Sequence, residues 1–176
     1  MKLAIGDFWI RDLELEDGPS ITRHADNPRV AQMLRDLFPS PYSLTAALEF
    51  ILMTNRTEPR AAFAIASDEE AFGVIGFNPG QDVYRFSAEI GYWIGEDYWG
   101  RGIMTRAVKA FSDHLFATHD FHRLFAGTFS SNPASGRVLE KAGFVLEGVF
   151  RAHVTKNGHL LDEHLYARVR PGSSAS

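Results

Sequence analysis

The sequence predicts an α/β fold built on a mixed sheet, and three observations support this class. Apolar runs of strand length alternate with segments of helical periodicity along most of the chain. Near the middle, a strand, a glycine loop and an amphipathic helix lead to another strand, which indicates one βαβ crossover. The last third contains two strand-like runs joined at Asn157-Gly158, which is a strong hairpin signal.

Length and composition predict one domain. The chain has 176 residues, and no linker separates two stretches that could each form a core. A hydrophobic content of 45% with 14 phenylalanines is sufficient for a packed interior. We therefore assign residues 1–170 to a single domain. Residues 171–176 are small and polar, and we expect them to form a flexible tail.

Charge and residue usage exclude several classes of function. The absence of cysteine rules out disulfides and thiolate chemistry, and it suits a reducing cytoplasm. A net charge of -4 provides no broad basic field, so we expect neither nucleic-acid nor membrane binding. No stretch approaches the roughly 18 apolar residues of a membrane span. The seven histidines show no metal-ligand spacing, so we expect no metal. The absence of cysteine and of a membrane span leads us to expect a soluble cytoplasmic protein.

One strand and two main helices are expected in the first sixty residues. Residues 8–15 alternate loosely between apolar and polar and indicate a strand. Asn27-Pro28 is a typical cap and first turn for a helix with apolar residues as far as Leu37. A second helix begins at Ser43 or Thr45.

The remaining two thirds of the chain supplies most of the sheet. The expected strands cover residues 62–66, 72–77, 86–94, 123–129, 144–154 and 160–169. A helix is expected from the glycine loop to about Leu115, and a second one from Asn132-Pro133 to Lys141, where Gly143 provides a C-terminal stop.

The glycine loop is the strongest functional signal. Gly100 and Gly102 precede a helix, where free backbone N–H groups meet the positive end of the helix dipole. This arrangement binds phosphate or pyrophosphate, and Arg101 and Arg106 can add charge. The loop matches neither a Walker motif nor a dinucleotide-binding fingerprint. Another kind of nucleotide-binding domain, or a simple loop before a helix, remains an alternative at this point.

Several segments in the same order resemble the GNAT N-acetyltransferase superfamily, and within it the RimJ/RimL type that acetylates ribosomal-protein N-termini. The segments are residues 88–94, 98–107, 132–135, 138–144 and Glu147-Gly148. The resemblance implies the acyl-CoA N-acyltransferase fold, with a central, mostly antiparallel sheet of about seven strands and flanking helices. It also implies acetyl-CoA as the co-substrate.

The same resemblance assigns coenzyme-binding residues. Residues 100–105 grip the pyrophosphate mainly through backbone amides. The coenzyme-binding residues of this segment are Trp99, Gly100, Arg101, Gly102, Ile103, Met104 and Thr105. Trp99 and Met104 depart from the strict family signature. Trp93 and Ile94, on the preceding strand, would pair their backbone with the pantetheine arm as an added strand does.

Candidate catalytic residues also come from the resemblance. Glu89 is the first candidate for the general base that deprotonates the amine, with a purely structural carboxylate as the alternative. Ser135 resembles the serine that acts as acid toward the leaving sulfur, and Asn132 resembles the asparagine that holds the pantetheine arm. Both are also residues that any helix start favours. Residues 151–155 contain no second carboxylate, and His153 is a further candidate base.

The expected reaction is acetyl transfer from acetyl-CoA to a primary amine, by direct attack in a ternary complex. The favoured acceptor is a protein or peptide N-terminus, and the alternatives are a polyamine, an amino acid or an antibiotic amine. A noncatalytic acyl-CoA-binding module is a third reading. We expect a monomer or homodimer. Polar residues of the last strand near the expected acceptor side are interpreted as hairpin and edge-strand surface, and they are Asp162, Glu163, His164 and Tyr166.

Overall fold

The structure is a computed structural model that describes residues 1–173. Its contacts group the chain into two interleaved units. Unit 1 comprises Met1–Gly76 and Tyr92–Ala107, and unit 2 comprises Phe77–Gly91 and Val108 onward. Two strands and one helix contribute residues to both units. The single domain over 1–170 stays a prediction.

Eight strands form one mixed sheet in the order β1-β2-β3-β4-β5-β6-β8-β7. The predicted fold class is confirmed, and β5 and β6 pair in parallel as expected for the βαβ crossover. The strand beyond the expected seven is β1 (Lys2–Ala4), which pairs antiparallel with β2 (Trp9–Arg11). Its three residues are too few to give a periodic signal in the sequence.

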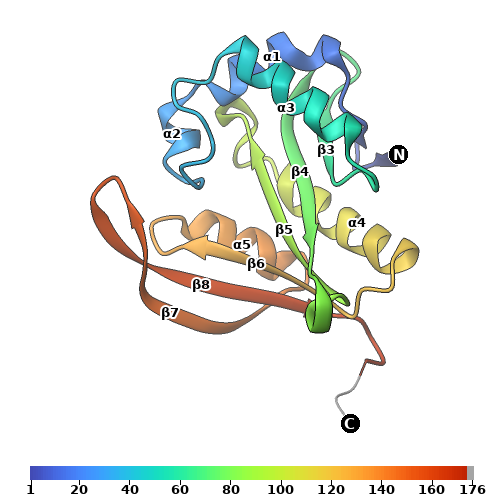
Figure 1. Cartoon of the computed structure of the whole chain (residues 1–176), viewed down its shortest axis with the longest axis vertical. Helices are drawn as coiled ribbons and strands as arrows, with labels where there is room; N and C mark the ends of the chain where they lie inside the picture. The colour runs from blue at the N-terminus through green and yellow to red at the C-terminus, as the bar shows by residue number, and fades with distance from the viewer. Residues whose placement is uncertain (174–176) are drawn as a thin grey trace. The chain divides into compact units, whose positions relative to one another are not determined.

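Unit 1 contains the N-terminal strands and helices. Its elements are β1, β2, η1 (Leu15–Asp17), α1 (Gly18–Ala25), α2 (Pro28–Ala31), α3 (Leu44–Arg56), β3 (Ala62–Ala66), most of β4 (Ala71–Pro79), the end of β5 (Ser87–Ile94), η3 (Glu96–Tyr98) and the start of α4 (Ile103–Thr118). β2, β3 and β4 pair antiparallel in succession. Helices α1 and α3 lie side by side (Figure 1).

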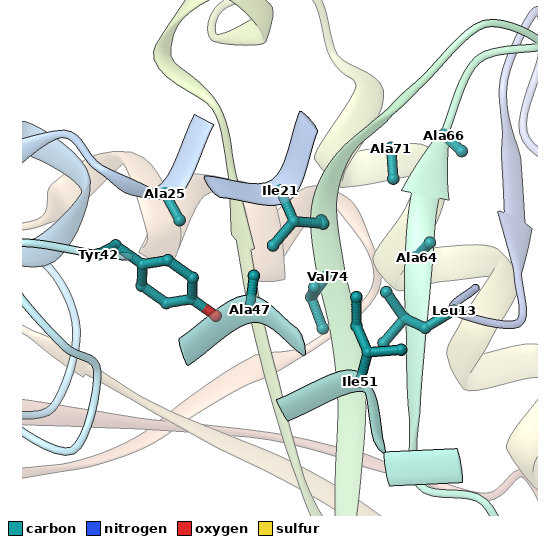
Figure 2. Close-up of a cluster of buried hydrophobic side chains, with 10 residues drawn as sticks. All are labelled: Leu13, Ile21, Ala25, Tyr42, Ala47, Ile51, Ala64, Ala66, Ala71 and Val74. Carbon is teal, nitrogen blue, oxygen red and sulfur yellow. The ribbon is translucent and has the colours of Figure 1, made fainter. Parts of the chain in front are cut away.

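Apolar side chains from two helices and two strands form the core of unit 1. Figure 2 shows Ile21 of α1 and Ile51 of α3 directed toward Val74 of β4, and all three are almost fully buried. The ten side chains of this cluster are Leu13, Ile21, Ala25, Tyr42, Ala47, Ile51, Ala64, Ala66, Ala71 and Val74. Many are alanines, so the helices approach the strands closely.

Two of the predicted helix starts are confirmed by their caps. Asn27 accepts a hydrogen bond from Arg29 N at 2.8 Å, and Ser43 accepts one from Ala46 N at 3.2 Å. The predicted extension to Leu37 is wrong, because α2 ends at Ala31. The side chain of Leu37 is 93% exposed, so its apolar spacing does not reflect a buried helical face.

Unit 2 contains the C-terminal half of the sheet. Its complete elements are β6 (Arg123–Phe129), α5 (Pro133–Lys141), β7 (Val145–Lys156), β8 (His159–Val169) and η2 (Asp82–Tyr84). β7 and β8 form a long hairpin, drawn in orange-red in Figure 1. Asn157 and Gly158 both have positive φ at its turn, as the Asn-Gly signal predicts.

The prediction that the last strand is an edge strand is wrong. β8 lies between β6 and β7, and β7 forms the edge of the sheet. A hairpin signal specifies which strands pair but not which of them finds a second neighbour. Because β8 is internal, its polar residues have neighbours on both sides.

The expected flexible tail is described only in part. Residues 171–173 follow β8, and Ser173 N donates to Arg170 O at 3.1 Å, so this portion turns back on the chain. Residues 174–176 lie outside the described part of the chain. In the described residues, no helix is long and apolar enough to cross a membrane.

Candidate active site

The glycine loop lies in unit 1, at the start of α4. Gly100 and Gly102 have φ values of +73° and +69°, a region that glycine adopts with little strain. A Cβ atom built on Gly100 would have no neighbour within 4 Å, so the space beside this residue is open. A ligand can therefore approach the backbone closely.

The first amides of α4 are suited to bind an anion. The backbone hydrogen bond from Arg106 N to Gly102 O, at 3.2 Å, closes the first turn. The backbone N–H groups that precede Arg106, at the start of the helix, have no helical carbonyl acceptor one turn earlier. The side chains of Ile103 and Met104 are only 1% and 7% exposed, so these residues can offer a ligand little but their backbone. This agrees with a grip made by amides rather than by side chains.

The Arg106 side chain supports the loop through hydrogen bonds to two backbone carbonyl oxygens. These bonds do not favour the predicted pairing of Arg106 with phosphate. Its Nε donates to Ile5 O at 3.2 Å, and its Nη1 donates to Arg101 O at 3.4 Å. Arg101 itself is exposed, with its guanidinium carbon 5.4 Å from the centre of the Tyr98 ring. Arg101 is therefore the loop arginine whose exposed side chain can turn toward a phosphate.

Tyr98 anchors the segment that enters the loop, a role that the sequence analysis missed. Its ring stacks on Phe72 of β4 with centroids 3.7 Å apart, and its hydroxyl donates to Glu70 at 2.8 Å. Partial burial, together with the hydrogen bond to Glu70, raises the pKa of Tyr98 to about 12. Glu70 also contacts His24 at 3.3 Å and pairs with Arg23. The loop is thus tied to the β3–β4 hairpin and to α1.

Trp93 and Ile94 end β5 beside β4. A Cβ atom on Gly73 would lie 2.6 Å from Trp93 O, so this glycine allows β4 to approach β5 closely here. The Trp99 indole donates to Ile94 O at 2.8 Å. A carbonyl oxygen has two lone pairs, so this bond leaves room for a second donor. The pairing of these residues with the pantetheine arm stays a prediction.

Glu89 lies in unit 2, on β5, and is half-buried. It is in register with Phe125 of β6, which is in register with Ala167 of β8, so these side chains share a face. In the described residues, β6 pairs with β5 only over Arg123–Phe125, whereas it pairs with β8 along its whole length. The later part of β6 therefore leaves one backbone edge unpaired by a strand.

Asn132 and Ser135 begin α5 in unit 2. Asn132 is the N-cap, and its side-chain oxygen accepts a hydrogen bond from Ser135 N at 3.2 Å. The prediction that Asn132 caps this helix is therefore confirmed. The cap uses only the side-chain oxygen, so the NH₂ group of the same amide can bind a ligand. Both residues are half-buried. Their proposed roles toward coenzyme remain predictions.

The polar residues of β8 are less exposed than an edge strand would make them. Tyr166 is 5% exposed and its hydroxyl lies 3.5 Å from Glu140 on α5, and burial with this carboxylate raises its pKa. Asp162 accepts the backbone N–H of Ala152 at 2.8 Å. Glu163 lies 3.5 Å from His153, the further candidate base.

No metal centre is formed by the described residues, because no three His, Asp or Glu side chains lie where they could share an ion. The amide loop lies in unit 1, and the polar groups near Glu89 and Asn132 lie in unit 2. An anion-binding loop, a carboxylate and a helix-start amide suit transfer of a group from a phosphate-bearing carrier.

Residues 7–145 match the acetyltransferase (GNAT) domain family. The chain belongs to this family and is a GNAT N-acetyltransferase, whose acyl donor is acetyl-CoA. The predicted family, fold and co-substrate are confirmed.

Three comparisons describe its similarity to individual proteins. The ribosomal-protein-serine acetyltransferase of Escherichia coli is 35% identical over 107 residues, which cover 61% of this chain and 59% of that protein. The spermidine N(1)-acetyltransferase of Escherichia coli is 27% identical over 152 residues, covering 85% and 78% respectively. The solved structure of the RimL ribosomal alpha-N-protein acetyltransferase with coenzyme A has a TM-score of 0.83 and 24% identity, covering 96% and 98%, and it shows the shared fold.

Proposed function

We propose that this enzyme acetylates the α-amino group at the N-terminus of a protein or peptide. The observation that supports acetyl-CoA binding, the first part of this proposal, is the open amide loop at the start of α4, with Gly100 and Gly102 at positive φ. The acceptor half is supported by the 35% identity to a ribosomal-protein-serine acetyltransferase. A cytoplasmic location is part of the same proposal.

In this proposal two sets of residues bind the coenzyme. Residues 100–105 are assigned to the pyrophosphate, and Trp99, directly before them, also belongs to the coenzyme-binding segment. Trp93, Ile94 and Asn132 bind the pantetheine arm. The pattern of buried side chains and free amides at the loop supports the first assignment, because close backbone approach is what a pyrophosphate requires.

Acetyl-CoA, when bound, supplies the acetyl group as a thioester. An α-amino group titrates near 8, so at neutral pH it must lose a proton before its nitrogen can attack. Glu89 is proposed to accept that proton. The new N–C bond forms as the C–S bond breaks. The Ser135 hydroxyl is proposed to donate a proton to the departing sulfur, which leaves as a thiol, and to regain one from the nitrogen, which loses its second proton as the amide forms.

Small amines are the second candidate acceptor, and one comparison favours them. The spermidine acetyltransferase aligns with 85% of this chain, a larger share than the ribosomal-protein enzyme. A noncatalytic acyl-CoA-binding module is less favoured, since Glu89, Asn132 and Ser135 are all retained on the folded chain.

The acceptor is tested by following thiol release from acetyl-CoA with a panel of amines. We expect faster acetylation of short peptides beginning with serine or alanine than of spermidine or of internal lysines. Mass spectrometry of the products locates the acetyl group. Acetylation of spermidine, an amino acid or a drug amine alone, with no labelled peptide N-terminus at millimolar substrate, would reject the peptide acceptor and leave the acetyl-CoA assignment intact.

A further inference from the structure

A second carboxylate lies on the same face of unit 2 as Glu89. Residues directly opposite one another in a sheet project from one face, and the face changes with each step along a strand. Glu89 is opposite Phe125, and Phe129, four residues further along β6, is opposite Glu163. Glu163 therefore shares the Glu89 face, whereas Tyr166 projects from the other face toward Gly136 of α5.

The Glu163 side chain extends along the sheet toward Glu89. A Cβ atom on Gly127 would overlap its carboxylate and would lie 2.9 Å from its Cδ, so the carboxylate covers Gly127. Gly127 is two residues beyond Phe125 on β6, the strand next to β5. The Glu163 carboxylate therefore lies on the Glu89 face, over the part of β6 that follows the residue paired with Glu89.

The neighbouring strand holds Glu163 in this position through a bulge. Register between β7 and β8 shifts between Phe150 and Val154, and Ala152 in this stretch has φ of +50°. A non-glycine residue there is strained, and the Asp162 carboxylate stabilises it by accepting Ala152 N–H at 2.8 Å. The bulge directs His153 toward Glu163, with 3.5 Å between Nε2 and Oε2.

The exposed fractions of the Glu163 and His153 side chains indicate that Glu163 is the partner that binds a ligand. The Glu163 side chain is 17% exposed, so its charge is largely removed from water, and the His153 imidazole lies 3.5 Å from it. His153 is 58% exposed and is charged only when protonated. A largely buried carboxylate is stabilised by a full opposite charge, which an ammonium group supplies.

We propose that Glu163 is a second acceptor-binding carboxylate, which pairs with the ammonium form of the amine substrate on the Glu89 face. His153 and Gly127 act as positioning residues that hold it there. This inference rests on the proposed function, because it requires an amine acceptor. Glu163 captures the cationic amine, and Glu89 remains the group that accepts its proton.

The test is steady-state kinetics of Glu163→Gln with a tripeptide amide that begins with serine. A lost charge-assisted hydrogen bond should raise KM for the peptide at least about tenfold while kcat changes much less. Gly127→Ala keeps the charge but places a methyl group where the carboxylate lies, so it should raise the same KM. The dissociation constant of acetyl-CoA should be unchanged in both variants.

Glu147→Gln is the matched control. Glu147 is an exposed carboxylate of the same sheet that pairs with Arg123 at 2.5 and 2.9 Å, and its variant should retain the wild-type KM. A folded Glu163→Gln protein with unchanged KM overturns the inference and leaves the amine acetyltransferase intact. If the wild-type enzyme acetylates no amine, the proposed function fails and this inference fails with it.

Discussion

The Tyr98 hydroxyl donates to Glu70 Oε1 at 2.8 Å, and this bond connects the entry of the glycine loop to the β3–β4 hairpin. Stacking of the Tyr98 ring on Phe72 fixes the same segment from the side. The backbone amides of the loop are useful only if they are held in place, since free amides bind an anion well when they need no reordering. Tyr98 and Arg106 are the two side chains that provide this support.

The coenzyme loop is tested by Gly102→Val. A branched side chain at φ of +69° strains the backbone and blocks close approach of the pyrophosphate, so the dissociation constant of acetyl-CoA should rise at least about tenfold, or ~1.4 kcal/mol. Isothermal calorimetry measures it. Gly158→Val is the control, because Gly158 has a similar φ of +77° in the β7–β8 turn, to which no coenzyme contact is assigned, and its variant should bind coenzyme normally. Unchanged affinity in folded Gly102→Val would show that the loop is misassigned.

The proposed base is tested by Glu89→Gln. This change keeps the shape and removes the basicity, so kcat/KM should fall by about 10²–10⁴ at neutral pH. The loss should shrink as the pH approaches the pKa of the amine, because the substrate then arrives deprotonated. A pH–rate profile of both enzymes checks this. A loss that stays constant across pH would indicate that Glu89 positions the substrate instead.

The double role of Asn132 is separated by two substitutions. Asn132→Ala removes the cap on Ser135 N and should cost about 1 kcal/mol of stability. Asn132→Asp keeps a cap oxygen and loses only the NH₂ group, so its stability should stay near wild type. If Asn132 also binds the pantetheine arm, both variants should weaken acetyl-CoA binding. Weak binding in the Ala variant alone would assign the residue a capping role only.

The Glu70 cluster predicts an acid-sensitive fold. Burial opposes ionisation of Glu70, but the hydrogen bond from Tyr98, the nearby His24 and the charge of Arg23 outweigh it and lower the pKa of Glu70 below its ordinary value of 4.5. Because the folded-state pKa is the lower one, this stabilisation is present above pH 4.5 and is lost as the pH falls through the folded-state pKa.

Urea unfolding over a pH series tests this linkage. Glu70→Gln should lose less stability than wild type on going from neutral to acid pH. Glu69→Gln is the control, since Glu69 is the exposed carboxylate next to it. Equal acid sensitivity in Glu70→Gln and wild type would exclude this cluster as its source.

The local features of the chain followed from the sequence. Asn27, Ser43 and Asn132 cap helices because their side chains bond amides two or three residues away, and the Asn157-Gly158 turn depends only on its own backbone preferences. The glycine loop was identified in the same way. Such signals act over a few residues, so they can be read without knowledge of the fold.

Tertiary structure alone decided which distant groups meet. The Glu163 carboxylate lies over Gly127 because β8 pairs with β6 in a particular register, and a shift of one residue would turn it to the other face. Tyr98 meets Glu70 through packing of segments 28 residues apart. Strand order and register come from burial summed over the whole chain, and no short stretch of sequence contains that sum.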